Sequence, residues 1–161
     1  MSGAHLFHGT SIHCLLSILS EGVMRADLGQ DDHPDGVSMS TSFEVARIFA
    51  VQAEEFAAYR EGFPDRGDPC QGAVLHFDRQ RVEERAGLRR VLWDGVSVEA
   101  EMRSTGSFAT EGALIGFEIA EEDIDWYREV AVDIDEPLLA LLNELATHPA
   151  RISMASSNPS P

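Results

Sequence analysis

The segment Leu6-Phe7-His8-Gly9-Thr10-Ser11 decides the fold, together with a second segment of the same type, Gly36-Val37-Ser38-Met39-Ser40-Thr41-Ser42. Each is a short apolar run that ends in small polar residues, which is typical of a strand that leads into a helix. Apolar residues at helical spacing follow both segments. The sequence therefore predicts two strand–helix units near its N-terminus.

The first unit is predicted as a strand over residues 4–8, with Thr10 or Ser11 capping a helix that ends at Gly22. A polar loop over residues 25–36 follows.

The second unit is predicted as a strand over Val37–Ser40, in which Ser38 and Ser40 share one face. Thr41 and Glu44 have the spacing of a capping box at the start of the next helix. One apolar face is expected on that helix, made of Ala46, Phe49, Ala50, Ala53, Phe56 and Ala57. Residues 60–72 are expected to form a surface loop.

The rest of the chain predicts mainly strands, then one helix and a tail. Strands are expected over Ala73–Asp78, Val91–Val98 (around a turn at Asp94-Gly95), Glu99–Ser104, Ala113–Ile119 and Glu129–Asp135. Pro137 marks the start of a final helix. One domain is expected over residues 1–147, and the Ser/Pro-rich residues 148–161 are expected to be disordered. This order indicates an α+β fold.

The charge balance restricts the partners. The 161 residues include 28 acidic and 12 basic side chains, for a net charge of −16, and all of the cations are arginines. Non-specific binding to a phosphate backbone depends on clustered Lys and Arg, so we expect none. The arginine-rich segment over residues 79–90 is interpreted as a solvated helical face beside Glu83 and Glu84.

Membrane association is not expected either. No apolar run approaches the ~20 residues of a membrane span, and the N-terminus lacks a signal-peptide pattern. The expected location is the cytoplasm, although a toxin delivered into another cell would have the same features.

Cysteine and metal chemistry are also not expected. Cys14 lies in an apolar helical pattern and is expected to be buried, whereas Cys70 lies in a Pro/Gly-rich loop and is expected to be exposed. Two such cysteines make neither a disulfide framework nor a metal motif. The other candidate ligands match no established metal-site spacing: His5, His8, His13, Asp31, Asp32 and His33.

Three motifs in a fixed order carry a resemblance to a known family. His8-Gly9-Thr10 after an apolar strand, Ser40-Thr41-Ser42 at the start of a helix, and Glu99-x-Glu101 late in the chain resemble the ADP-ribosyltransferase superfamily. The resemblance extends over residues 4–135, where Ala73–Asp78 and Ala113–Asp125 look like the later strands of the family. It implies a split β-sheet core that binds NAD+ and cleaves its nicotinamide–ribose bond.

The resemblance also implies roles for single residues. His8 would hydrogen-bond the adenosine-side ribose, and the backbone of Gly9 would hold the nicotinamide carboxamide, since glycine allows close approach. The other implied NAD+ contacts come from small hydroxyl side chains: Thr10, Ser38, Ser40, Thr41 and Ser42. Poly-ADP-ribose polymerases have a tyrosine in the second strand, and the toxin relatives have an arginine in place of His8. The site therefore resembles a hybrid of the two.

Glu101 is the implied catalytic residue, with Glu99 assisting from the same side of a strand. A carboxylate that accepts a hydrogen bond from the ribose 2′-hydroxyl stabilises an oxocarbenium-like transition state. Such a group contributes ~3 kcal/mol, or about a hundredfold in rate. Glu111 and Glu118 are the alternatives in this acidic chain.

The resemblance implies a mono-ADP-ribosyltransferase that uses NAD+ as co-substrate, with a protein or a small molecule preferred over nucleic acid as acceptor. Two alternatives stay open. One is an NAD+-dependent RNA 2′-phosphotransferase, which shares the His-Gly-Thr strand but for which the sequence shows no evident basic groove. The other is a nucleotide-binding or interaction module on the same fold, without turnover. A toxin, a phage-encoded modifier and a housekeeping enzyme would all fit.

Overall fold

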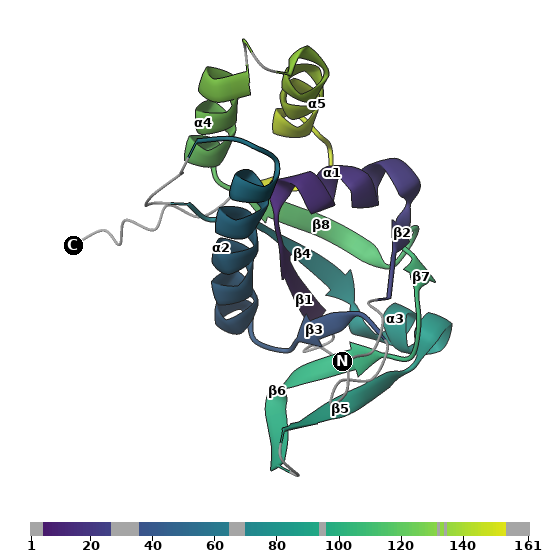
Figure 1. Ribbon diagram of the computed structural model, residues 1–161. Coiled ribbons are helices and arrows are strands. Elements are labelled where there is room, and N and C mark those ends of the chain that lie inside the picture. Colours follow the sequence, from purple (N-terminus) through teal and green to yellow (C-terminus); the bar gives the residue numbers. More distant parts are fainter. Residues whose placement is uncertain are drawn as a thin grey trace, which may run out of the picture.

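The computed structural model describes residues 5–26, 36–64, 70–93, 96–131, 133 and 135–153, and it has a mixed α+β fold (Figure 1). The strands are β1 (His5–Thr10), β2 (Val23–Met24), β3 (Ser38–Ser40), β4 (Ala73–Asp78), β5 (Leu88–Trp93), β6 (Val96–Ser104), β7 (Phe108–Ala109), β8 (Leu114–Ile119) and β9 (Arg151–Ser153). The helices are α1 (Ile12–Glu21), α2 (Phe43–Arg60), α3 (Arg79–Ala86), α4 (Glu121–Ala131) and α5 (Glu136–Ala146).

Seven of these strands form one sheet, in the order β5-β6-β3-β1-β4-β8-β9. Its pairs are antiparallel except for β8 and β9, which are parallel. β2 and β7 pair separately, beyond the end of α1 (Figure 1).

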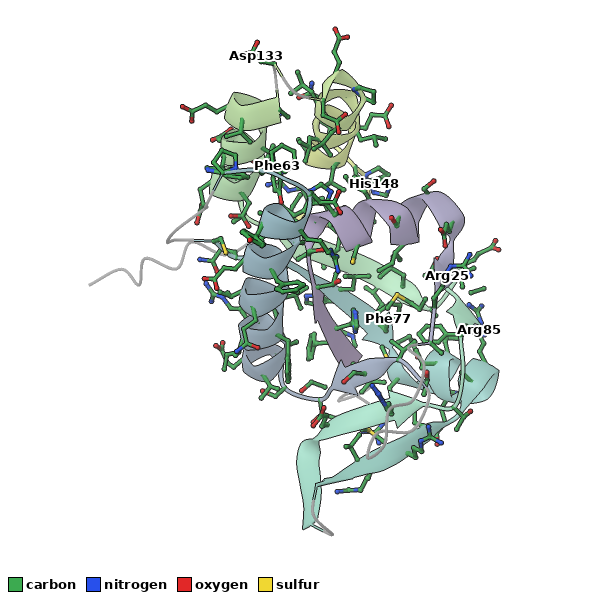
Figure 2. The ribbon with its side chains drawn as sticks, in the orientation of Figure 1. Arg25, Phe63, Phe77, Arg85, Asp133 and His148 are labelled. Atoms are coloured by element: carbon green, nitrogen blue, oxygen red, sulfur yellow. The ribbon has the colours of Figure 1, made fainter. Side chains whose placement is uncertain are left out.

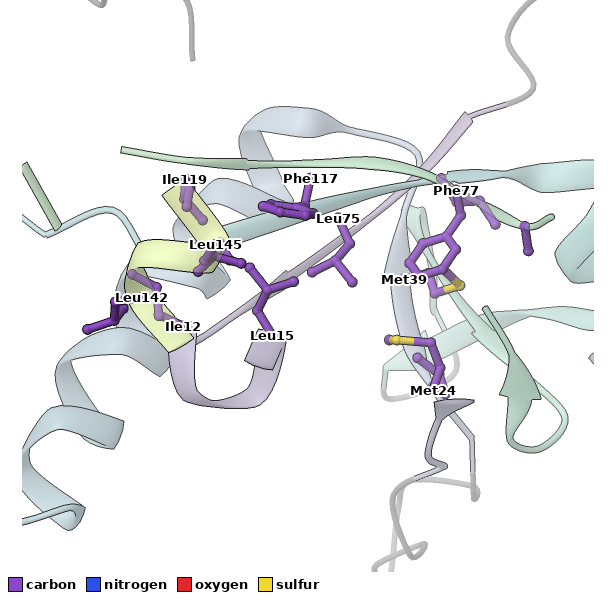
Figure 3. Close-up of a cluster of buried hydrophobic side chains, with 14 of the residues drawn as sticks. Ile12, Leu15, Met24, Met39, Leu75, Phe77, Phe117, Ile119, Leu142 and Leu145 are labelled. Atoms are coloured by element: carbon purple, nitrogen blue, oxygen red, sulfur yellow. The ribbon is translucent and has the colours of Figure 1, made fainter. Parts of the chain in front are cut away.

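The two N-terminal helices pack on opposite faces of this sheet, because successive side chains of a strand point to opposite sides. Leu75 of β4 belongs to the main core with Ile12 and Leu15 of α1, as Figure 3 shows. Its neighbour Val74 packs instead against Ala46 and related residues of α2. Helices α4 and α5 add Ile124, Tyr127, Leu138, Leu142 and Leu145 to the main core.

The pairing between β1 and β3 is short. These two described strands share a single pair of opposed residues, Phe7 and Ser40, whereas β1 and β4 share six. Beyond Phe7 and Ser40 the strands diverge, which leaves a seam in the middle of the sheet.

The helix caps differ in part from the sequence patterns. Ser11 caps α1, with its hydroxyl accepting the Cys14 amide at 3.1 Å, and Gly22 ends that helix at a φ of 70°. The capping box predicted at Thr41 is wrong, because α2 starts one residue later. Ser42 is its cap, and the Ser42 hydroxyl accepts the Val45 amide at 3.3 Å.

Three predicted segments are corrected. The predicted strand over Glu129–Asp135 is wrong, since α4 continues to Ala131, and the strand-like reading of residues 121–125 fails for the same reason. Both segments belong to α4, a helix with acidic residues in its first turn, which the strand interpretation missed. Residues 148–153, expected within a disordered tail, include β9, whose backbone pairs with β8.

Both cysteine predictions are wrong. Cys14 is exposed, because α1 buries Ile12 and Leu15 and turns Cys14 away from them. Cys70 is buried, and its thiol lies 3.7 Å from the Val51 carbonyl of α2.

Candidate functional site

Two hollows lie on either side of the seam between β1 and β3. The α1 hollow has a volume of about 390 Å³ and is lined by His8, Gly9, Thr10, Cys14, Ser17, Ile18, Glu21, Val23, Met24, Arg25 and Val37. The α2 groove has a volume of about 430 Å³ and is lined by Phe7, His8, Gly9, Ser38, Met39, Ser40, Ala46, Phe49, Gln52, Ala53, Phe56 and Glu101. Both volumes are within the range of small-molecule sites.

His8 and Gly9 line both hollows, so they form the bridge between them. At the outer end of the α1 hollow, Arg25 makes an ion pair with Glu21 at 2.6 Å; Figure 2 shows Arg25 beyond the end of α1.

The imidazole of His8 bridges the seam where main-chain pairing has ended. Its Nδ1 lies 2.6 Å from the carbonyl oxygen of Ser38. Because a carbonyl oxygen can only accept, Nδ1 carries the proton and donates it. A ligand contact from His8 would therefore use Nε2.

Ser38 connects this histidine to Glu101. Directly opposed residues of an antiparallel pair project to the same face, and Ser40 lies opposite Glu101 while Ser38 lies opposite Arg103. The Ser38 hydroxyl donates to Glu101 Oε1 at 3.4 Å, across 63 residues of sequence. His8, Ser38 and Glu101 thus form one chain of contacts along the α2 groove.

Gly9 is held against helix α2. A Cβ atom there would lie 1.8 Å from the Ala46 carbonyl oxygen and 2.7 Å from the Ala50 amide nitrogen. Only glycine permits this approach of strand and helix. The bare backbone of Gly9 was expected to serve a ligand, and the packing of α2 gives a second reason for a glycine at this position.

The other predicted hydroxyl residues separate into two groups. Ser40 lines the α2 groove and also accepts the Ser42 amide at 2.9 Å, and Thr10 lines the α1 hollow. Thr41 is exposed and Ser42 caps α2, so both lie outside the described lining of the two hollows.

Among the candidate glutamates, Glu101 is the one that lines the α2 groove in the described part of the chain. Glu99 lies in β6, and its side chain is outside the described residues. Glu111 is exposed in the turn before β8. Glu118 lies in β8, and its carboxylate is 2.8 Å from Nε2 of His76 in β4. Because β3, β1 and β4 separate β8 from β6, Glu118 lies apart from Glu101 in the sheet.

Sequence reasoning missed the α2 wall of the groove. Phe49 and Phe56 were expected in the buried face of the helix, yet both are exposed and line the groove with Gln52. Against β1 the helix buries alanines instead, because the close approach at Gly9 leaves no room for rings. The signal available in the sequence was the mixture of alanines and phenylalanines along this helix, which allows either type of residue to be the buried one.

Two arginines lie in the sheet row beside Ser38. Arg89 of β5 lies directly opposite Arg103 of β6, which in turn lies opposite Ser38. The interpretation of residues 79–90 as one helical face is therefore corrected, since α3 ends at Ala86 and the later arginines lie in a strand.

The described residues contain no group of three or more His, Cys, Asp or Glu side chains that could hold a metal ion, and Asp31, Asp32 and His33 lie outside them. In the same part of the chain, no helix has the length and apolar character needed to cross a membrane.

The geometry joins a histidine, a serine and a carboxylate on one side of a seam that opens into two hollows. Such a set can hold an extended polar ligand and place a carboxylate beside one of its hydroxyl groups. Comparison with protein-family models, with curated proteins and with solved structures finds no match to this chain.

Proposed function

We propose that this chain is a mono-ADP-ribosyltransferase, which cleaves NAD+ at the nicotinamide–ribose bond and transfers ADP-ribose to an acceptor. The observation that carries the proposal is the contact chain from His8 through Ser38 to Glu101. These residues come from three sequence regions and three strands, and they line one groove. The family resemblance names the same three positions.

NAD+ would lie across the seam. His8 would contact the adenosine-side ribose through Nε2 from between the two hollows, and the Gly9 backbone would hold the carboxamide. The nicotinamide ring would enter the α2 groove, where the exposed ring of Phe49 offers an aromatic surface for stacking.

In the reaction, the bond between ribose C1′ and the pyridinium nitrogen breaks, and nicotinamide leaves with the electron pair. Positive charge then develops on C1′ and the ring oxygen. Glu101, held by the Ser38 hydroxyl, would accept a hydrogen bond from the 2′-hydroxyl and stabilise this charge. The acceptor supplies an electron pair to C1′ and loses a proton to solvent.

The proposal is tested by nicotinamide release from NAD+, measured by chromatography. We expect slow release by the natural chain, and a reduction of about a hundredfold in Glu101→Gln, because the amide removes the negative charge from the transition state. Glu111→Gln is the matched control: the same change in an exposed turn should leave the rate unaltered.

Binding of NAD+ without release, across a range of candidate acceptors, would favour the binding module without turnover. Absence of both binding and release would overturn the proposal.

The second candidate is an RNA 2′-phosphotransferase. NAD+ consumption that occurs only with 2′-phosphorylated RNA would replace the first proposal with this one.

A further inference from the structure

Exposed large apolar side chains are concentrated on one helix. In the described part of the chain, α2 carries four of them: Ile48, Phe49, Phe56 and Tyr59, with 58%, 48%, 65% and 77% of their surface exposed. The other two, Ile115 and Leu141, lie apart from each other on β8 and α5. Single exposed apolar residues need no explanation, but a group of four on one helix points to an interaction.

These four residues lie on one face of the helix as two pairs, Ile48 with Phe49 and Phe56 with Tyr59, separated by the exposed Gln52. At about 100° of rotation per residue, positions 48, 49, 56 and 59 fall within about 100° of one helix face. We call this set of four the α2 stripe. Phe49 and Phe56 form its edge on the α2 groove, and Ile48 and Tyr59 lie outside the described groove lining.

Carboxylates border the α2 stripe on the side away from the groove. Glu44 and Glu55 are exposed there, and their positions place them within about 40° of Ile48. Arg60 lies 5.6 Å from the centre of the Phe56 ring, so the stripe already holds one guanidinium over an aromatic face.

We propose that the α2 stripe is a docking surface for a basic, amphipathic protein segment. Apolar residues of that segment would cover the stripe, and its cations would pair with the bordering carboxylates in a chain of net charge −16. Resting on the proposed function, the segment belongs to the acceptor protein, and docking brings its nucleophile to the groove that contains Glu101. A nucleic acid would be repelled by the same carboxylates.

The test uses the full chain and a fluorescein-labelled peptide of 18 residues, an amphipathic helix of Leu and Arg. Two comparison peptides have Glu in place of Arg, or the same composition in scrambled order. Binding is followed by fluorescence anisotropy at low and high salt. The variant Ile48→Ser/Tyr59→Ser removes half of the stripe without touching the described groove lining, and Ile115→Ser/Leu141→Ser is the matched control elsewhere.

We expect the basic amphipathic peptide to bind, more weakly at high salt, and the stripe variant to lose about tenfold or more in affinity. The control variant should bind as the natural chain does. Equal binding of the acidic or the scrambled peptide, or equal binding by both variants, would overturn the proposal. So would sedimentation showing that the natural chain is a dimer which the stripe variant dissociates, since a second copy would then occupy the stripe.

Nicotinamide release in the absence of peptide separates this inference from the proposed function. Release should be equal in the natural chain and in the stripe variant, because Ile48 and Tyr59 do not contact the groove. Loss of peptide binding with normal nicotinamide release would show that the α2 stripe contributes to docking and not to the reaction. Peptide binding without any release in any protein would leave the docking surface in place and remove the transferase.

Discussion

At the scale of single residues, Ser38 and Ser42 show how two similar hydroxyl groups take different tasks. Ser38 donates to Glu101, and Ser42 caps α2. On the proposed function, Ser38→Ala should lower kcat for nicotinamide release about tenfold, because a bond to a charged group contributes about 1.5 kcal/mol. The same change should alter the free energy of unfolding by less than about 0.5 kcal/mol. Ser42→Ala should cost about 1 kcal/mol of stability and leave kcat unaltered.

Chromatography of released nicotinamide and urea unfolding give the two quantities for each variant. If Ser42→Ala reduced kcat as much as Ser38→Ala, the helix start would belong to the site after all, as the family resemblance implied.

The sequence predicted the local part of this site but not its assembly. The alternation of Ser38 with Met39 could be predicted because a period of two is a local property. The opposition of Ser40 and Glu101 could not, because strand register depends on every pair along β3 and β6. The family resemblance alone placed the two together.

At the scale of elements, the helices were predicted better in position than in orientation. Helix α2 was expected to bury Phe49 and Phe56, yet it buries alanines against Gly9 and leaves the rings in the groove. Hydrophobicity alone favours phenylalanine over alanine in a core. The close contact between β1 and α2 reverses that preference, because only small side chains fit between them. Helix α4 was missed because its apolar residues were read as strands, although its acidic first turn is a helix-start signal.

Helix α4 also holds the chain that enters β4. The buried carboxylate of Asp123 accepts the amides of Gln71 at 3.0 Å and Gly72 at 2.8 Å. Asp123→Ala should lower the free energy of unfolding by about 3 kcal/mol, since two buried amides lose a charged acceptor. Asp125→Ala, on the same helix, should cost less than about 1 kcal/mol, because its ion pair with Arg128 is exposed. Urea unfolding measures both, and equal losses would contradict this role of Asp123.

At the scale of the whole molecule, an aromatic cluster connects α1, the segment after α2, and α4, which are far apart in the sequence. The ring of His13 in α1 lies 5.9 Å from that of Phe63 and 5.4 Å from that of Tyr127 in α4, measured between ring centres. Figure 2 shows Phe63 beside α4, at the end of the molecule away from the β5–β6 hairpin. Protonation of His13 would therefore place a charge between α1, α4 and the segment that follows α2.

Stability should consequently fall as the pH drops below neutrality. Burial lowers the pKa of His13 below its ordinary 6.5, although Glu61 and Asp135 act in the opposite direction and Arg60 adds to the lowering. Below about pH 6.5 the unfolded chain takes up this proton before the folded chain does. The free energy of unfolding therefore falls until the pH is below the pKa of His13 in the folded state.

The variant His13→Phe keeps an aromatic ring in the cluster and removes the proton site. Between about pH 7.5 and about pH 5.5, the natural chain should lose more free energy of unfolding than His13→Phe does. The net charge of −16 and the other histidines affect both proteins alike, so they cancel in the difference. Parallel curves would show that His13 takes up its proton in the folded state as readily as in the unfolded one, and that the cluster tolerates the charge.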